Sequence, residues 1–292
     1  MADSSPDLFC IGNLTVDESV QPDGTRTEAL GGDAVFAALA ARLAGGRAGW
    51  LAPIGTDLPA PLAARLDAAG LSLDQPRRDL ATVRNVVRYA ADGGRTWHLV
   101  RGEEHFERMS VHPADVPPAV LAARGLLVLA MSLDAQLALT PWLRRHSSAT
   151  IYQDLQEDYL AGHEAELLAL AGHCDAFLPS EAEATHLAGT KDPVAAARHF
   201  AGLGPRVVVV KLAERGCLVV EDGAVTEVAA ETVEPVDPTG AGDAFCGAFA
   251  AVHLATGDAV AAARAAVRVA ALAVRGPGVV PLLDAVAAEV RA

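Results

Sequence analysis

Short apolar runs alternate with longer segments of helical period along most of the chain. Six runs are typical of buried strands, over residues 8–12, 48–55, 125–131, 149–155, 176–180 and 206–212. Five segments between and after them carry apolar residues at helical spacing, over residues 34–43, 60–69, 135–145, 164–171 and 193–203. An uninterrupted apolar run indicates a strand that is covered on both faces. The alternation therefore predicts an α/β fold, a three-layer sandwich with a mostly parallel central sheet and helices on both faces.

Two stretches depart from this alternation. Residues 17–30 and 84–101 place alternating side chains around the turn sequences Pro22-Asp23-Gly24 and Asp92-Gly93-Gly94, as β-hairpins do. We expect both to project from the main sheet as a small β lid. A third hairpin, over residues 216–228 with a turn at Asp222-Gly223, is expected to end the sheet. No linker or internal repeat divides the chain, which predicts a single domain over residues 1–292.

The charge balance narrows the choice of partners. The 292 residues include 23 basic and 37 acidic side chains, a net charge of −14 without runs of one sign. Such a surface repels phosphate backbones and anionic membranes, so we expect neither nucleic acid nor a membrane as partner. The first residues do not resemble a secretory signal, and the four cysteines lie far apart in apolar surroundings. These features predict a cytoplasmic protein that binds a small molecule.

The sequence DPTGAGDAF, residues 237–245, leads into the first of three alanine-rich helical segments, 241–255, 259–274 and 282–291. Gly240 and Gly242 let the backbone approach a ligand closely, and amide groups at a helix N-terminus attract an anion. A carboxylate beside a phosphate repels it, so Asp243 needs a separate purpose. It can accept the proton of a substrate hydroxyl that attacks a phosphoryl group. The alternative is a capped helix in which Asp243 only complements the helix dipole.

This motif resembles the C-terminal signature of the ribokinase-like (PfkB) family of carbohydrate and nucleoside kinases at all nine positions. The order of features also matches: Asp17 after the first strand, Gly31-Gly32 before a helix, two lid hairpins, then the signature. The resemblance implies a ribokinase-like fold and an ATP-dependent kinase that phosphorylates a hydroxyl of a sugar, cyclitol or nucleoside. It further implies Mg²⁺ as cofactor and lid strands that can pair in a homodimer.

The resemblance assigns roles to individual residues. It implies that Asp243 is the catalytic base and that the backbone of Gly240, Ala241 and Gly242 forms an anion hole. Asp17 would bind substrate hydroxyls above Gly31 and Gly32. The alternative for Asp17 is a solvated turn residue, and the alternative for the two glycines is an ordinary helix start capped by Asp33. The further candidates for substrate contact are Asp33, Phe36, Arg101, Asp154 and Gln156. The candidates for nucleotide contact are Lys211, Ala213, Gly216, Thr239, Gly240, Gly242 and Gly276.

The segment LPSEAEA, residues 178–184, is similar to the family's asparagine-x-x-glutamate motif, with Ser180 in place of the asparagine. The resemblance implies that Glu183 acts on Mg²⁺ indirectly, through water. Ser180 and Glu183 also have the spacing of a capping box at a helix start, and the two interpretations are compatible.

Three departures from the family pattern bear on function. Phe36 stands where the family has a substrate-binding asparagine, and Lys211 and Ala213 stand where it more often has threonine and glycine. A phenyl ring cannot hydrogen-bond a hydroxyl; Phe36 either belongs to the core or packs on a ligand ring. Two alternatives therefore remain beside the kinase for sugars, cyclitols or nucleosides. One is a non-catalytic ligand sensor on the same fold, and the other is a kinase for a vitamin-like heterocyclic alcohol.

Overall fold

The computed structural model describes residues 5–89 and 95–291. Its main sheet has eight strands and is parallel from β4 to β10, while β11 and β12 form an antiparallel hairpin at one edge. The predicted mostly parallel sheet and the predicted edge hairpin are both confirmed. In spatial order the strands are β12 (Ala224–Val228), β11 (Cys217–Glu221), β10 (Val207–Lys211), β9 (Ala176–Phe177), β8 (Thr150–Gln153), β7 (Gly125–Val128), β1 (Leu8–Ile11) and β4 (Ala48–Leu51).

The apolar runs form central strands because both faces of the sheet are covered. In β10, Val207 and Val209 belong to one hydrophobic core, and Val208 and Val210 belong to the other. Successive side chains of a strand point to opposite faces, so an apolar residue is needed at every position. The same division separates Cys10 from Ile11 in β1.

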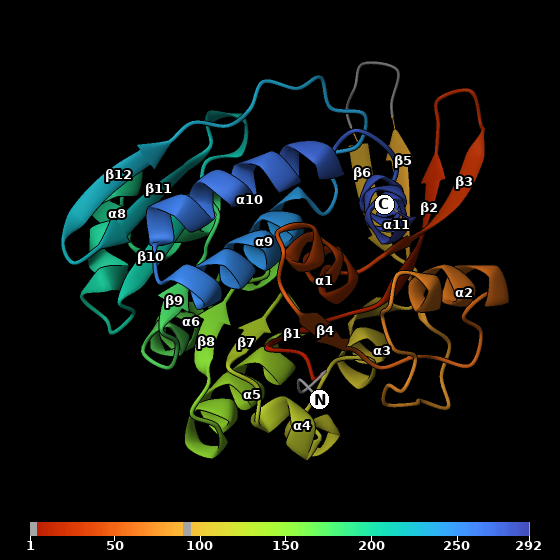
Figure 1. Cartoon of the computed structure of the whole chain (residues 1–292), viewed down its shortest axis with the longest axis horizontal. Helices are drawn as coiled ribbons and strands as arrows, with labels where there is room; N and C mark the ends of the chain where they lie inside the picture. Colours follow the sequence, from red (N-terminus) through yellow and green to blue (C-terminus); the bar gives the residue numbers. More distant parts are fainter. Residues whose placement is uncertain (1–4, 90–94, 292) are drawn as a thin grey trace.

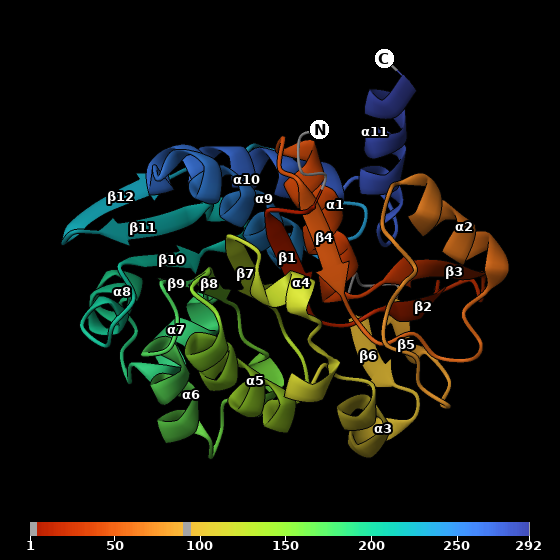
Figure 2. The same cartoon turned by 60° about the horizontal axis from the view of Figure 1, so that its bottom comes forward.

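Helices cover the two faces of this sheet, as Figures 1 and 2 show. One layer consists of α1 (Asp33–Leu43), α9 (Ala241–Thr256) and α10 (Ala259–Ala273). The opposite layer consists of α5 (Leu133–His146), α6 (Glu164–Ala171), α7 (Glu181–Leu187) and α8 (Pro193–Ala201). The remaining helices are α2 (Ala60–Ala68), α3 (Gly102–Arg108), α4 (Pro118–Leu121) and α11 (Val280–Arg291). The three-layer prediction is confirmed. None of the helices within the described residues is both long and apolar enough to cross a bilayer.

Helices α1 and α9 pack at very short range, and this contact places the start of α9. A Cβ atom added to Gly247 would lie only 2.0 Å from the carbonyl oxygen of Ala37. The alanine-rich faces of both helices are fully buried. Small side chains are therefore required where the two backbones meet.

A second sheet of four strands lies beside the main one, near α11 (Figures 1 and 2). Its order is β3 (Arg26–Gly31), β2 (Thr15–Val20), β5 (Val83–Tyr89) and β6 (Arg95–Leu99). The strands pair in antiparallel fashion within each predicted hairpin, whereas β2 and β5 join the hairpins in parallel. The predicted turn at Asp92-Gly93-Gly94 lies outside the described residues. The small β unit predicted from the two hairpins is confirmed, and only the parallel pairing of β2 with β5 was not indicated by the sequence.

Candidate active site

Polar side chains gather where the parallel strands of the main sheet end. Asn13 follows β1, Asp154 follows β8, Ser180 follows β9, and Lys211 is the last residue of β10. The carboxyl ends of parallel strands share one edge, which is where open α/β sheets bind ligands. Lys211 extends from this edge toward the start of α9, because its Nζ atom lies 3.5 Å from Sγ of Cys246.

The turn before α9 has a geometry that requires glycine. Gly240 is the N-cap residue of α9 and adopts the left-handed conformation, with φ of 77°. A Cβ atom there would lie 2.3 Å from ring atoms of Phe36. Asp237 holds the turn: its Oδ1 accepts from the amide of Thr239 at 2.9 Å and its Oδ2 accepts from the amide of Gly278 at 3.3 Å. Asp237 thus joins the turn before α9 to the loop before α11.

The backbone N–H groups of this turn differ in whether they donate a hydrogen bond to a backbone carbonyl. The N–H of Ala241 donates to the carbonyl of Pro238 at 3.3 Å, which closes the turn. Within the described part of the chain, the backbone hydrogen bonds include none from the N–H of Gly240 or Gly242. An unpaired amide at a helix N-terminus is a donor that an anion can satisfy. Of the three residues predicted to form an anion hole, Ala241 therefore has its amide bound to a backbone carbonyl, and the anion hole itself stays a prediction.

Phe36 lies beneath this turn rather than at its surface. Its side chain is only 1% exposed and belongs to the hydrophobic core. The sequence left open whether the ring contacts a ligand or the core, and the structure places it in the core. Because the ring fills the space beside Gly240, Phe36 supports the turn.

Asp243 lies in the first turn of α9, directly after the glycine turn. Its side chain is half-buried. Burial raises the pKa of Asp243 to about 7; the charge of Asp154 adds to the rise and that of Lys211 opposes it. A carboxyl group with this pKa exchanges its proton readily at neutral pH, as a general base requires.

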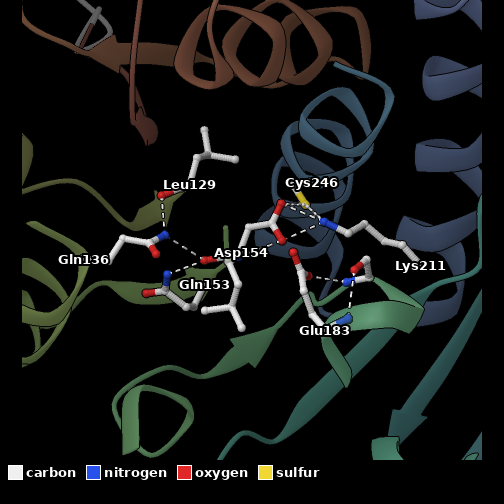
Figure 3. Close-up of polar contacts among 9 residues, drawn as sticks. Leu129, Gln136, Gln153, Asp154, Glu183, Lys211 and Cys246 are labelled. Atoms are coloured by element: carbon white, nitrogen blue, oxygen red, sulfur yellow. Dashed lines mark hydrogen bonds and ion pairs between the residues drawn. The ribbon is translucent and has the colours of Figure 1, made fainter. Parts of the chain in front are cut away.

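Asp154 and Lys211 form a buried ion pair beside this helix (Figure 3). The Nζ atom of Lys211 donates to Oδ1 of Asp154 at 2.6 Å and to Oδ2 at 2.7 Å, and the two side chains are 15% and 5% exposed. The thiol of Cys246 donates to Oδ2 of Asp154 at 3.3 Å, and the amide of Leu155 donates to Oδ1 at 2.9 Å. Both carboxylate oxygens are therefore fully engaged.

The main chain of Asp154 is fixed as well. Its amide donates to the carbonyl of Val128 at 2.9 Å, and its carbonyl accepts from Nε2 of Gln136 at 3.2 Å. The same Gln136 group donates to the carbonyl of Leu129 at 2.8 Å, and Gln153 also donates to the carbonyl of Asp154 (Figure 3). These buried bonds hold the carboxylate in one place relative to the sheet.

Asp17 and the double glycine meet on the side of the second sheet. A Cβ atom on Gly31 would lie 1.9 Å from Oδ2 of Asp17, so only glycine fits beneath that carboxylate. Nδ2 of Asn85 donates to Oδ1 of Asp17 at 2.9 Å. Burial raises the pKa of Asp17 to about 6, although the bond from Asn85 lowers it. Gly32 has φ of 97°, and a Cβ there would lie 2.4 Å from the carbonyl oxygen of Asn13.

Asp33 joins this acidic region, but it does not cap α1. The N-cap residue is Gly32, which makes no side-chain bond, and Asp33 is the first residue of the helix. Its Oδ2 atom accepts from Nδ2 of Asn13 at 3.2 Å. Burial raises the pKa of Asp33 well above its usual range, and the charges of Asp243, Asp154 and Asp17 add to the rise. The structure thus brings four predicted carboxylates close enough to influence one another.

Sequence reasoning missed two asparagines that bind these carboxylates. Asn13 and Asn85 are 1% and 8% exposed. Within the described residues, their Oδ1 atoms are buried and lack a hydrogen-bond partner. The only signal for Asn13 was its place after a strand, and Asn85 had none because the pairing of β5 with β2 is a tertiary feature.

A sequence profile of the pfkB family of carbohydrate kinases matches residues 7–285. The chain belongs to this family. It is 31% identical over 253 residues to a cytidine kinase of Thermococcus kodakarensis, covering 84% of this chain and 87% of that protein. The family confirms the predicted phosphotransferase with an alcohol group as acceptor.

Solved structures support the predicted fold of this pfkB family member. A ribokinase from Thermotoga maritima superposes with a TM-score of 0.79 at 21% identity, covering 98% of this chain and 100% of the other. A ribokinase from Arabidopsis thaliana, complexed with ribose and ATP, gives 0.78 at 22% identity, with 97% of each chain covered. The ribokinase-like fold is therefore confirmed.

Three other predicted site residues of this pfkB kinase have surroundings of their own. Arg101 is exposed at the start of α3; burial lowers the pKa of His105, and the charge of Arg101 adds to this. Gln156 donates to the carboxylate of Asp158 at 2.8 Å, away from Asp154. Gly276 is buried in the loop before α11.

The turn between β10 and β11 contains three predicted nucleotide contacts. Lys211, the last residue of β10, pairs with Asp154, as described above, and its contact with a nucleotide stays a prediction. Ala213 is exposed and adopts a positive φ of 52°, which is unusual for a residue with a Cβ atom. At Gly216, with φ of 97°, a Cβ would lie 2.0 Å from the carbonyl oxygen of Val228. A glycine at position 216 is therefore required by the turn itself.

Glu183 takes part in the predicted capping box at the start of α7. The amide of Glu183 donates to Oγ of Ser180 at 3.2 Å, and the amide of Ser180 donates to Oε2 of Glu183 at 2.6 Å. Burial raises the pKa of Glu183 to about 7, and the charge of Asp154 adds to the rise. Across the described residues, no three His, Cys, Asp or Glu side chains are grouped as metal ligands. The carboxyl group of Glu183 would hold Mg²⁺ only through a bound water, if the ion arrives with its nucleotide.

Proposed function

We propose that the protein transfers the terminal phosphoryl group of ATP to a hydroxyl of a nucleoside or a related sugar. The observation that carries this proposal is the position of Asp243. A carboxyl group whose pKa lies near 7 directly follows a glycine turn with two amide groups that no backbone acceptor within the described residues engages. A proton acceptor and an anion site within one turn of the chain match the two needs of phosphoryl transfer to an alcohol.

The reaction follows from this placement. The substrate hydroxyl gives its proton to Asp243 as its oxygen forms a bond to the terminal phosphorus of ATP. The bond from that phosphorus to the bridging oxygen breaks, and ADP leaves. The amides of Gly240 and Gly242 donate to the transferred phosphoryl oxygens. Mg²⁺, when bound with the nucleotide, neutralises phosphate charge, and Glu183 would hold one of its waters.

The second sheet has the position of a lid over the substrate in this proposal. Asp17 and Asn85 belong to its strands β2 and β5 and meet above Gly31, at the sheet edge where Asp33 lies. Closure of this sheet over the substrate would exclude water, which otherwise competes for the phosphoryl group. We propose the same sheet as the surface through which a homodimer would form.

Two observations favour a nucleoside or related sugar as acceptor. The carboxylate of Asp17 and the buried Oδ1 atoms of Asn13 and Asn85 are acceptors that adjacent sugar hydroxyls satisfy as donors. The similarity to a cytidine kinase covers most of both chains. A vicinal diol, as in ribose, offers two donors to one carboxylate.

A substrate panel tests the proposal. The protein is incubated with ATP, Mg²⁺ and one acceptor at a time, namely cytidine, other nucleosides, ribose, deoxyribose, cyclitols or a pyridine or pyrimidine alcohol. Phosphorylated product is identified by mass spectrometry. We expect turnover with a nucleoside or a pentose. Binding without product across the whole panel would instead support the ligand sensor, and product only with a heterocyclic alcohol would support the vitamin-like kinase.

Replacing Asp17 by asparagine should weaken substrate binding more than chemistry. Asp17→Asn removes a charged acceptor whose hydrogen bonds contribute about 2 kcal/mol, so we expect KM for the acceptor to rise roughly 10- to 100-fold with a smaller change in kcat. Steady-state kinetics with varied acceptor measure this. Glu18→Gln is the matched control, because Glu18 is the next residue of β2, faces the other side of the sheet and pairs with Arg26. An unchanged KM in Asp17→Asn contradicts the assignment.

A further inference from the structure

The ion pair of Asp154 and Lys211 lies against the same face of α9 as Asp243. Cys246 follows Asp243 by three residues, so the two side chains are neighbours on one helix face. The Cys246 sulfur contacts Oδ2 of Asp154 at 3.3 Å and Nζ of Lys211 at 3.5 Å. A Cβ atom on Gly242 would lie 3.6 Å from the same Nζ. The pair therefore adjoins the turn that carries the base.

The pair is also rigid and nearly dry. Each carboxylate oxygen of Asp154 binds Nζ of Lys211 and one further donor, and the side chains are 5% and 15% exposed. Lys211 enters from β10, whose amide at this residue donates to the carbonyl of Pro179 at 2.9 Å. Charges that are fixed in a poorly hydrated place act on a neighbouring carboxyl group with little screening.

We infer that Asp154 and Lys211 act together as positioning residues that set the pH at which Asp243 becomes a base. This inference rests on the proposed function. Asp154 disfavours a charge on Asp243, and Lys211 favours it, so the two contributions oppose each other. The pH at which Asp243 loses its proton then depends on both members of the pair being present. This role of Lys211 would come in addition to any contact with the nucleotide.

Other groups near the base are included in this inference. Among the described residues, the titratable and charged side chains that face this region include Asp33 of α1, Asp154 after β8, Glu183 of α7, Lys211 of β10 and Cys246 of α9. Burial raises the pKa of the Cys246 thiol well above its usual range, so it stays neutral. Burial raises the pKa of Glu183 to about 7, as it does for Asp243, and it raises the pKa of Asp17 and Asp33 as well. The signals of these three carboxyl groups need separation from that of Asp243.

Removing the positive charge of Lys211 and removing the negative charge of Asp154 should shift the pH profile of kcat/KM in opposite directions. Activity requires ionised Asp243, so kcat/KM rises with pH through the pKa of that group. Lys211→Met removes the favourable charge and leaves Asp154 unpaired. The acidic limb of the pH profile, where kcat/KM rises with pH, then moves up by about one pH unit. Asp154→Asn moves the limb down by a similar amount. The double variant, which loses both charges, should return close to the wild-type limb.

The pH dependence of kcat/KM is measured for the four proteins, with the Asp243 side-chain carboxyl carbon followed by NMR in parallel. The NMR titration needs no turnover, so it decides the inference even if the substrate panel yields no product. Repeating it with Glu183→Gln, which preserves a capping box, separates the Glu183 signal. Lys211→Met leaves a buried charge and can fold poorly; the double variant and Asp154→Asn then still give a comparison.

The matched controls are Arg144→Met and Asp175→Asn. These residues form another ion pair, at 2.7 Å, where β9 begins, at the sheet edge opposite the site. Both variants should leave the acidic limb of the kcat/KM profile and the NMR titration of Asp243 unchanged. Shifts of the same sign in Lys211→Met and Asp154→Asn, or no shift in either, overturn the inference. A purely structural role of the pair would lower activity without moving the limb.

Discussion

Replacing Asp243 by asparagine should lower kcat by a factor of about 10³, because asparagine cannot accept the proton of the attacking hydroxyl. The substitution keeps the size of the side chain and leaves the glycine turn in place, since that turn is held by Asp237 and by the packing of Phe36. Nucleotide affinity should therefore change little. Kinetics at saturating ATP and acceptor, with calorimetric titration of the nucleotide, measure the two quantities separately.

The same variant should also be more stable than the wild type at neutral and higher pH. The pKa of Asp243 is raised from 3.8 to about 7 on folding, so the folded protein holds this proton more tightly than the unfolded chain. Wild-type stability therefore falls as pH rises from about 4 to about 7, and asparagine removes this loss. The gain in Tm of Asp243→Asn should grow across that range and level off above it.

Asp258→Asn is the control for both measurements. Asp258 caps α10 by accepting from the amide of Ala261 at 2.8 Å, near the opposite end of α9 from Asp243. Asparagine caps a helix about as well, so this variant loses one carboxylate without losing a bond. It should keep full kcat. Wild-type kcat in Asp243→Asn would remove Asp243 from the mechanism and the proposed function with it.

Replacing Gly240 by alanine should damage both folding and activity. The residue has φ of 77°, which is unfavourable for alanine, and the new methyl group would overlap the Phe36 ring at 2.3 Å. Strain and overpacking together should lower the free energy of unfolding by about 3 kcal/mol. The turn must also shift, so we expect kcat to fall more than 10-fold. Urea denaturation and steady-state kinetics measure these effects.

The other end of α9 provides the matched control for this substitution. Gly257 caps α9 with φ of 71°, and a Cβ atom there would meet nothing within 4 Å. Gly257→Ala therefore carries the backbone strain without the overlap, and should lose only about 1 kcal/mol of stability with kcat unchanged. Adding Phe36→Leu to Gly240→Ala should recover part of the difference. Equal losses in the two alanine variants would show that contact with Phe36 does not shape the turn.

The family signature was visible in the sequence because its function depends on local geometry. A tight turn followed by a helix needs glycine at fixed positions, and Gly240, Gly242 and Asp243 are consecutive or nearly so. The capping box of Ser180 and Glu183 and the loop bond of Asp237 were predictable for the same reason, since each joins residues two or three positions apart. The central strands were predictable because burial on both faces demands an unbroken apolar run.

The residues that surround Asp243 and Asp17 could not be predicted from local sequence. Asp154 and Lys211 are 57 residues apart, and Asn85 meets Asp17 across 68 residues. Nothing in the local sequence of Phe36 distinguishes a ring that packs under a glycine from one that contacts a ligand. Short helices such as α3 and α4 also carried too few residues to show a period.

By itself, therefore, the sequence determined the α/β architecture, the family and the conformation of the turn near residue 240, because hydrophobic period, turn conformation and helix capping act over a few residues. The tertiary structure decided that Phe36 belongs to the core, that β2 and β5 pair in parallel, and that an ion pair lies against the helix that carries Asp243. These outcomes depend on the packing of distant segments, which alone fixes how much water and which charges surround a side chain.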